Sequence, residues 1–168
     1  MQSIYVHIIG SLTLMLILTT VSIYLSAAQL NVQAGSVKHR LREVASYLSH
    51  EAVNLLVLMQ TSNSQLLVVR VEVPKLIGNE AYTITLLKQN GEFKVRLALQ
   101  YSQICCEELI PINSTSTGLT INQSSQYIGL IQGFKLYSSP QLYSGVDAAL
   151  WCRRGVDGFE IGLGVLRR

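Results

Sequence analysis

The sequence is short of the residue types on which catalysis and metal binding most often depend. Only three of its 168 residues are histidines, and Asp, Glu, Lys and Arg together make up 14%. His7, His39 and His50 all lie within the first 50 residues, so the rest of the chain lacks the usual base of a hydrolytic triad and the commonest metal ligand. We therefore expect no enzyme activity, no catalytic residue, no metal site and no cofactor.

Cysteine is also scarce, and its spacing excludes the common zinc motifs. Cys105 and Cys106 are adjacent and Cys152 lies far along the chain, so the sequence has no CxxC pair. Two interpretations stay open. One is a disulfide from Cys105 or Cys106 to Cys152, which would contribute on the order of 4 kcal/mol through chain entropy. The other is three free thiols.

The sequence has no carboxylate pair or phosphate-binding loop of a recognisable kind. Glu107 and Glu108 are adjacent, so on a strand they point to opposite faces and cannot form a general acid and base pair. The glycines of "GFEIGLGVL", residues 158–166, lack the strand-to-helix setting of a phosphate loop and are more typical of close sheet packing. No block of Lys or Arg suits a phosphate backbone, so nucleic acid is not an expected partner.

What the sequence does contain is one long apolar run near its start. Residues 4–30, "IYVHIIGSLTLMLILTTVSIYLSAAQL", include no Asp, Glu, Lys or Arg, and a membrane-spanning helix needs about 20 such residues. Ser26, Ala27 and Ala28 imitate a signal-peptide cleavage site, but the apolar core is too long and no basic residue precedes it. Residues 1–30 are therefore interpreted as a retained transmembrane segment with membrane lipid as a partner.

Hydroxyl side chains interrupt this span without adding charge. Ser11, Thr13, Thr19, Thr20 and Ser22 fall within it, and such groups either bond across to neighbouring helices or bond back to carbonyls of their own helix. Both interpretations stay open. The first would favour self-association of the span.

Apolar residues continue beyond Leu30 in steps of three and four, which predicts an amphipathic helix over residues 31–61 that extends the span. Gly35 is the expected position of a bend, because glycine costs about 1 kcal/mol in a helix interior. The apolar stripe must be buried against the chain's own β domain, against copies of itself, or both. As a candidate helix-assembly stripe it comprises Ala34, Val37, Leu41, Val44, Leu48, Ala52, Leu55 and Met59.

Residues 62–168 change to the period of two that is typical of strands. "YTITLLKQ" and "EFKVRLALQ" flank Asn90-Gly91, the strongest short hairpin signal in a sequence, because both residues tolerate positive φ. The remaining segments predict about six to eight strands in an antiparallel β-sandwich-like domain, with "YIGLIQGFKLY" as one of them. The fold class is therefore α+β, with one long N-terminal helix followed by this domain.

Two features of the sequence give opposite predictions for the side of the membrane on which the β domain lies. Lys38, Arg40 and Arg42 follow the span, and the positive-inside rule would then put the domain in the cytoplasm. The domain, however, carries N-x-Ser/Thr sequons at Asn113 and Asn122 in a Ser/Thr-rich segment, which is typical of an exposed, glycosylated surface. We expect a single-pass membrane protein with its C-terminal domain outside, or an extracellular filament.

Three stretches together resemble archaeal type IV pilin-like proteins over roughly the first 100 residues. These are "IIGSLTLMLILTTVSIYLSAA", "VKHRLREVASYLSHEAVNLLVL" and "VEVPKLIGNEAYTITL". The resemblance implies a helix-plus-β-sandwich subunit that is processed by a prepilin-type peptidase. It also implies assembly helix to helix into a filament core, with sugars on the exposed sheet.

One feature departs from that family pattern. Its precursors carry a short basic leader with a glycine before the apolar run, and Met1, Gln2 and Ser3 offer none. Either a leader lies upstream of Met1, or the chain is an uncleaved accessory protein that stays in the membrane. The function expected is a pilin-like structural or accessory subunit of a surface filament, with a role in cell adhesion. The alternative is a monomeric anchored β-sandwich ectodomain that binds an envelope component or stabilises a surface appendage.

Overall fold

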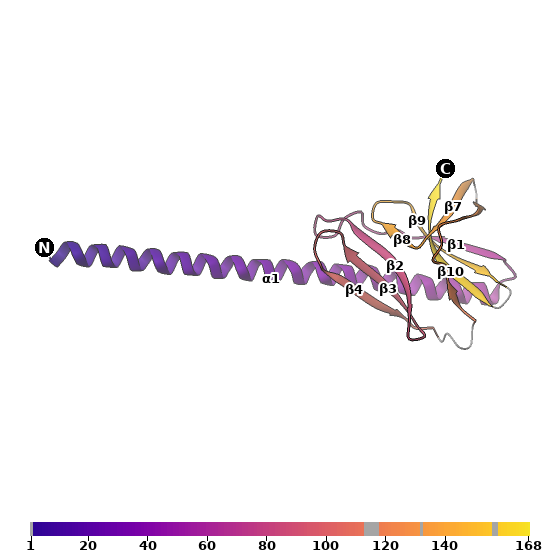
Figure 1. Ribbon diagram of the computed structural model, residues 1–168, viewed down its shortest axis with the longest axis horizontal. Helices are drawn as coiled ribbons and strands as arrows, with labels where there is room; N and C mark the ends of the chain where they lie inside the picture. Colours follow the sequence, from indigo (N-terminus) through magenta and orange to yellow (C-terminus); the bar gives the residue numbers. More distant parts are fainter. Residues whose placement is uncertain (1, 113–117, 132, 156–157) are drawn as a thin grey trace. The chain divides into compact units, whose positions relative to one another are not determined.

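The computed structural model describes residues 2–112, 118–131, 133–155 and 158–168, with side chains from Ile8 onward. The chain divides into two compact units, residues 1–37 and 38–168. One long helix, α1 (Gln2–Thr61), is followed by strands in antiparallel sheets (Figure 1), which confirms the predicted α+β class. The strands are β1 (Leu66–Arg70), β2 (Tyr82–Gln89), β3 (Glu92–Leu99), β4 (Cys105–Ile110), β5 (Thr120–Ile121), β6 (Tyr127–Ile131), β7 (Phe134–Ser139), β8 (Gln141–Tyr143), β9 (Ala148–Arg154) and β10 (Phe159–Arg167).

These strands form two sheets. The larger has the order β1-β9-β10-β7-β6 with β5 added to β10, and the smaller has the order β4-β3-β2-β8. All pairings in the two sheets are antiparallel except that of β5 with β10. The predicted hairpin at Asn90-Gly91 is present, with φ of 54° and 81° at its two turn residues and β2 paired to β3 on either side.

The described residues contain ten strands, more than the six to eight predicted. Residues 127–137, predicted as one strand, are the hairpin of β6 and β7, which turns next to Gly133 at a φ of 84°. The strands β5 and β8 have only two and three residues. Segments this short show no periodicity, so their pairing depends on tertiary neighbours.

The main core lies where the second part of α1, residues 38–61, meets the strands. Leu48, Leu55 and Met59 are at most 1% exposed, and each buried side chain of this size contributes about 1.5–3 kcal/mol. Ser49 Oγ donates a 2.9 Å hydrogen bond to the Leu109 carbonyl of β4. Figure 1 shows this part of α1 running alongside strands of both sheets, so it is an integral layer of the domain.

A second core forms inside the larger sheet around Trp151. Its side chain is fully buried and its indole Nε1 donates to the Leu163 carbonyl at 3.0 Å. A Cβ added to Gly162 would overlap the Trp151 ring, so the indole occupies the space that a side chain would fill. For Gly162 this confirms the predicted role in close sheet packing.

The larger sheet curls around this second core. Its edge strands β1 and β6 are four strand positions apart, which in a flat sheet of strands 4.8 Å apart would be roughly 19 Å. Yet Leu66 Cδ2 of β1 lies 4.0 Å from the Cβ position of Gly129 on β6. The two edges therefore approach each other over Trp151, and the sheet resembles an open barrel.

Candidate functional site

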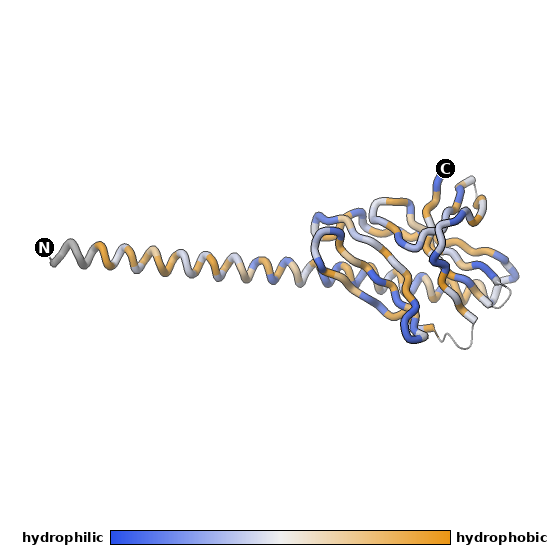
Figure 2. Tube along the Cα trace, viewed as in Figure 1, coloured by the Kyte–Doolittle hydropathy of each residue, from blue (hydrophilic) through white to orange (hydrophobic). Residues whose placement is uncertain are grey.

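The first part of α1 exposes an apolar surface on all sides. Every residue from 8 to 36 is exposed and none is charged, and hydrophobic colours dominate this part of the trace in Figure 2. The helix is long and apolar enough to cross a membrane. Because nothing in its own compact unit covers this surface, it is available to lipid or to other helices.

The hydroxyl groups of this segment bond to their own helix. Thr13 Oγ1 donates to the Ile9 carbonyl at 2.8 Å, and Thr20 Oγ1 donates to the Leu16 carbonyl at 2.7 Å. Ser11, Thr19 and Ser26 make similar bonds three or four residues back. Of the two interpretations left open, Ser11, Thr13, Thr19 and Thr20 have the internal bond, so these four groups can face lipid without a partner helix.

Of the surfaces left open for the candidate helix-assembly stripe, the structure shows the chain's own β domain at five of the eight positions. The β domain of the same chain covers these side chains, because the stripe faces the core that α1 shares with the strands. Leu41, Leu48, Ala52, Leu55 and Met59 are all at most 1% exposed, whereas Val44 and Val37 are half-buried and Ala34 is exposed. The buried positions cannot contact a second subunit without opening the domain.

Gly35 does not interrupt the helix. The helical assignment of α1 continues through it, and a Cβ added there would meet nothing within 4 Å. The boundary between the two compact units falls between Val37 and Lys38, two residues further on. The bend expected at Gly35 stays a prediction.

Two side chains of the basic segment that follows the span, Arg42 and His39, lie near carboxylates. Arg42 Nε lies 3.6 Å from Glu108 Oε2 of β4, and His39 Nε2 lies 3.3 Å from Glu43 Oε1 one turn along the helix. His50 Nδ1 lies 2.7 Å from the Ser46 carbonyl. The described residues contain no group of three potential metal ligands.

The three cysteines are free thiols, so the structure has the second of the two interpretations and not the disulfide. Cys105 and Cys106 lie on β4 of the smaller sheet, whereas Cys152 lies on β9 of the larger sheet and is fully buried. Burial, with a smaller effect of Glu160, raises the pKa of Cys152 to about 12, and burial followed by Glu108 raises the pKa of Cys106. Both thiols are therefore held in the unreactive protonated form.

The Asn122 side chain of the second sequon is buried in the folded domain, and Asn113 lies outside the described residues. The Asn122 side chain is 8% exposed, its Nδ2 donates to Glu160 Oε1 at 2.6 Å and its Oδ1 accepts from Ser138 Oγ at 3.1 Å. A glycan on Nδ2 would displace the bond to Glu160 and would need space that the surrounding strands fill. Asn122 is instead a structural residue that fixes β5 beside β7 and β10.

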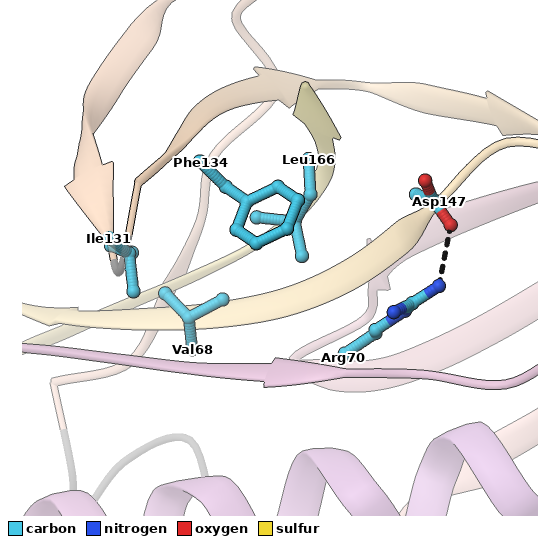
Figure 3. Close-up of a pocket in the computed structure, with 6 residues that line it drawn as sticks. All are labelled: Val68, Arg70, Ile131, Phe134, Asp147 and Leu166. Carbon is cyan, nitrogen blue, oxygen red and sulfur yellow. Dashed lines mark hydrogen bonds and ion pairs between the residues drawn. The ribbon is translucent and has the colours of Figure 1, made fainter. Parts of the chain in front are cut away.

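The open end of the curled sheet contains a cleft of about 280 Å³ (Figure 3). Val68, Ile131, Phe134 and Leu166 converge on it from β1, β6, β7 and β10. To one side, Arg70 Nη2 donates to Asp147 Oδ1 at 2.8 Å.

The described lining of the cleft is mainly apolar, so the cleft can hold an apolar group. Of the lining residues that the structure describes, only Arg70 and Asp147 are ionisable, and they are paired with each other with side chains more than half exposed. The sequence did not single out these residues, because they come from four separate strands and only strand pairing brings them together.

Comparison with protein-family models, with curated proteins and with solved structures found no match to this chain.

Proposed function

We propose that the chain is a membrane-anchored, pilin-like subunit of a cell-surface filament. The observation that carries the proposal is the exposed, uncharged apolar surface of α1 over residues 8–36. Such a surface needs lipid or other helices around it. The subunit would lie in the membrane before assembly and exchange lipid for neighbouring helices in the filament.

The second part of α1 supports the proposal because it is held by the chain's own β domain and leaves the first part to contact lipid or other helices. Its apolar stripe is buried in the chain's own β domain, and Arg154 Nη2 donates to the carbonyls of Met59 and Ser62 at 3.1 and 3.0 Å. These hydrogen bonds satisfy carbonyls at the C-terminal end of the helix, which otherwise lack partners. The helix is thereby fixed to the domain that it would carry to the cell surface, and we place that domain outside.

Cross-linking through the first part of α1 tests the proposal. In a chain with Cys105→Ser and Cys106→Ser, a single cysteine is introduced by Leu18→Cys and oxidised in intact cells with copper phenanthroline. We expect dimers of the chain, and the same dimers in filaments sheared from the cells. The matched control is Val57→Cys, which is 52% exposed on the second part of α1 and should cross-link far less. A chain that stays monomeric and entirely in the membrane fraction would contradict the proposal.

The second candidate function is a lone anchored ectodomain, and the hydroxyl groups of the span favour it. Because Thr13, Thr19 and Thr20 bond within their own helix, the span needs no neighbour to satisfy its polar groups. In that case Leu18→Cys gives only monomers, and the domain remains accessible to protease added outside the cells.

A further inference from the structure

A second groove, distinct from the cleft of Figure 3, lies over β6, β7 and the end of β10. Its volume is about 430 Å³, and its lining combines aromatic rings with polar side chains. Among the groove residues that the structure describes, none is a carboxylate. The aromatic and polar side chains that a ligand could contact there are Ser125, Gln126, Tyr127, Tyr137, Ser139 and Arg167.

Two tyrosines form an open aromatic corner in this groove. The ring centroids of Tyr127 and Tyr137 are 5.5 Å apart and the rings are inclined at 58°. Tyr127 is 55% exposed, and it sits at a register shift of β6 between Tyr127 and Gly129. An irregularity of this kind re-aims side chains and is common beside functional sites. Here it accompanies an aromatic pair that leaves much of one ring uncovered.

Two cations flank the same corner. Arg167 and Lys135 are direct cross-strand partners of β10 and β7, and the Arg167 guanidinium carbon lies 5.7 Å from the centre of the Tyr137 ring. Like charges at opposed positions destabilise a sheet. Within the described ranges neither cation forms an ion pair. The two cations therefore give this end of the groove a positive charge, which favours an anionic ligand.

We propose that this groove binds an acidic saccharide, that is, a sugar chain that carries carboxylates. The carboxylate would pair with the planar fork of Arg167, which suits that group geometrically. The apolar C–H face of the sugar ring would pack on Tyr127. Ser125 and Gln126 supply hydroxyl and amide groups for the sugar hydroxyls, and Ser139 Oγ, which donates to the Gln141 carbonyl at 2.6 Å, can accept a hydrogen bond from them.

Single-stranded nucleic acid fits the same features less well. Its affinity comes from several phosphate contacts along a basic track, whereas the groove has one lining arginine with Lys135 beside it. Rings inclined at 58° also cannot both stack on consecutive parallel bases. The neutral polar lining matches a hydroxyl-rich ligand instead.

Calorimetric titration of the full chain in a detergent without a sugar headgroup tests the proposal. The probes are trigalacturonate, the neutral galactose trisaccharide, a triglutamate peptide with the same number of carboxylates, and an oligothymidylate. We expect trigalacturonate to bind and the other three to bind at least roughly tenfold more weakly. Arg167→Gln should weaken trigalacturonate binding roughly tenfold to a hundredfold.

A matched pair of tyrosine variants separates stacking from general surface effects. Tyr127→Ala should weaken trigalacturonate binding about tenfold. Tyr143→Ala is the control, because Tyr143 is also 55% exposed but lies on β8 of the other sheet. The proposal is overturned if trigalacturonate does not bind, if any of the other probes binds as tightly, or if both tyrosine variants behave alike.

Discussion

The two parts of α1 are continuous in sequence and both rich in apolar residues, yet their side chains meet different surroundings. In residues 8–36 large apolar side chains such as Leu18 are exposed, at 61% for that residue. In residues 38–61 one stripe of apolar side chains is buried, with Leu48 at 1% exposed, although Val57 and Leu58 outside the stripe stay exposed. The contrast shows that apolar content alone does not predict that a helix contacts other subunits, because the apolar stripe in the second part of α1 packs against the chain's own β domain.

The largest effect is expected from Leu48→Asp. It places an unpaired charge in the main core and should lower the free energy of unfolding by about 5 kcal/mol or more. Loss of near-ultraviolet circular dichroism in detergent would measure it. Leu18→Asp is the matched variant in the first part of α1, and it should leave that signal intact while reducing membrane insertion by about 2.5–3.5 kcal/mol. Equal loss of the dichroism signal in both variants would contradict the contrast.

Gly162→Ala probes the core that encloses Trp151. The new methyl group would overlap the indole, so we expect a loss of about 1–3 kcal/mol in the free energy of unfolding from overpacking. Chemical denaturation followed by Trp151 fluorescence measures the change. Gly129→Ala serves as the control, because the nearest atom to its Cβ position is 4.0 Å away. A stable Gly162→Ala protein with unchanged fluorescence would show that the indole does not depend on this glycine.

Alkaline pH should lower the free energy of unfolding of residues 38–168, because a buried thiol and a buried phenol would then lose their protons. Burial raises the pKa of Cys152 from 9.0 to about 12, and burial also raises the pKa of Tyr82 from 10.0 to about 12. Both groups keep their protons to a higher pH in the folded state than in the unfolded state. Their contribution to stability is therefore fully present below pH 9 and is lost as the pH rises toward 12. The slope is about 1.4 kcal/mol per pH unit for each group that titrates only when unfolded.

Denaturation at a series of pH values measures this slope, and Cys152→Ala should remove the contribution of the thiol. A companion measurement is alkylation at pH 8. The exposed Cys105 should react with iodoacetamide and the buried Cys152 should not, until the chain is denatured. Rapid alkylation of Cys152 in the folded chain would contradict its burial.

The smallest effect is expected from Lys135→Gln. Removing one of two opposed cations should raise the free energy of unfolding of residues 38–168 by roughly 0.2–1 kcal/mol in the absence of ligand. The gain should shrink at high salt, because exposed charges are screened. Thermal denaturation at low and high salt measures both effects, and a destabilised Lys135→Gln protein would mean that the two cations do not repel each other.

Several features were predictable from the sequence because they depend on local physics. The uncharged run of residues 4–30, the helical stripe beyond Leu30 and the hairpin at Asn90-Gly91 each follow from composition, periodicity or backbone preference over a few residues. The close packing at Gly162 was also predictable as a role for glycine, although the indole that fills the space was not.

Other features were decided only by the tertiary structure. The sequence determined that the stripe from Leu41 to Met59 must be buried, but the fold decided that the chain's own strands bury it. The sequence placed Asn122 in a sequon, but the strand β5 that pairs with β10 turned it into a buried hydrogen-bond partner of Glu160. The groove at Tyr127 exists only because strand register sets residues from separate segments side by side. Local preferences act over a few residues, whereas burial and strand register depend on contacts between residues far apart in the sequence. Burial and register therefore cannot be predicted from any short stretch of the sequence.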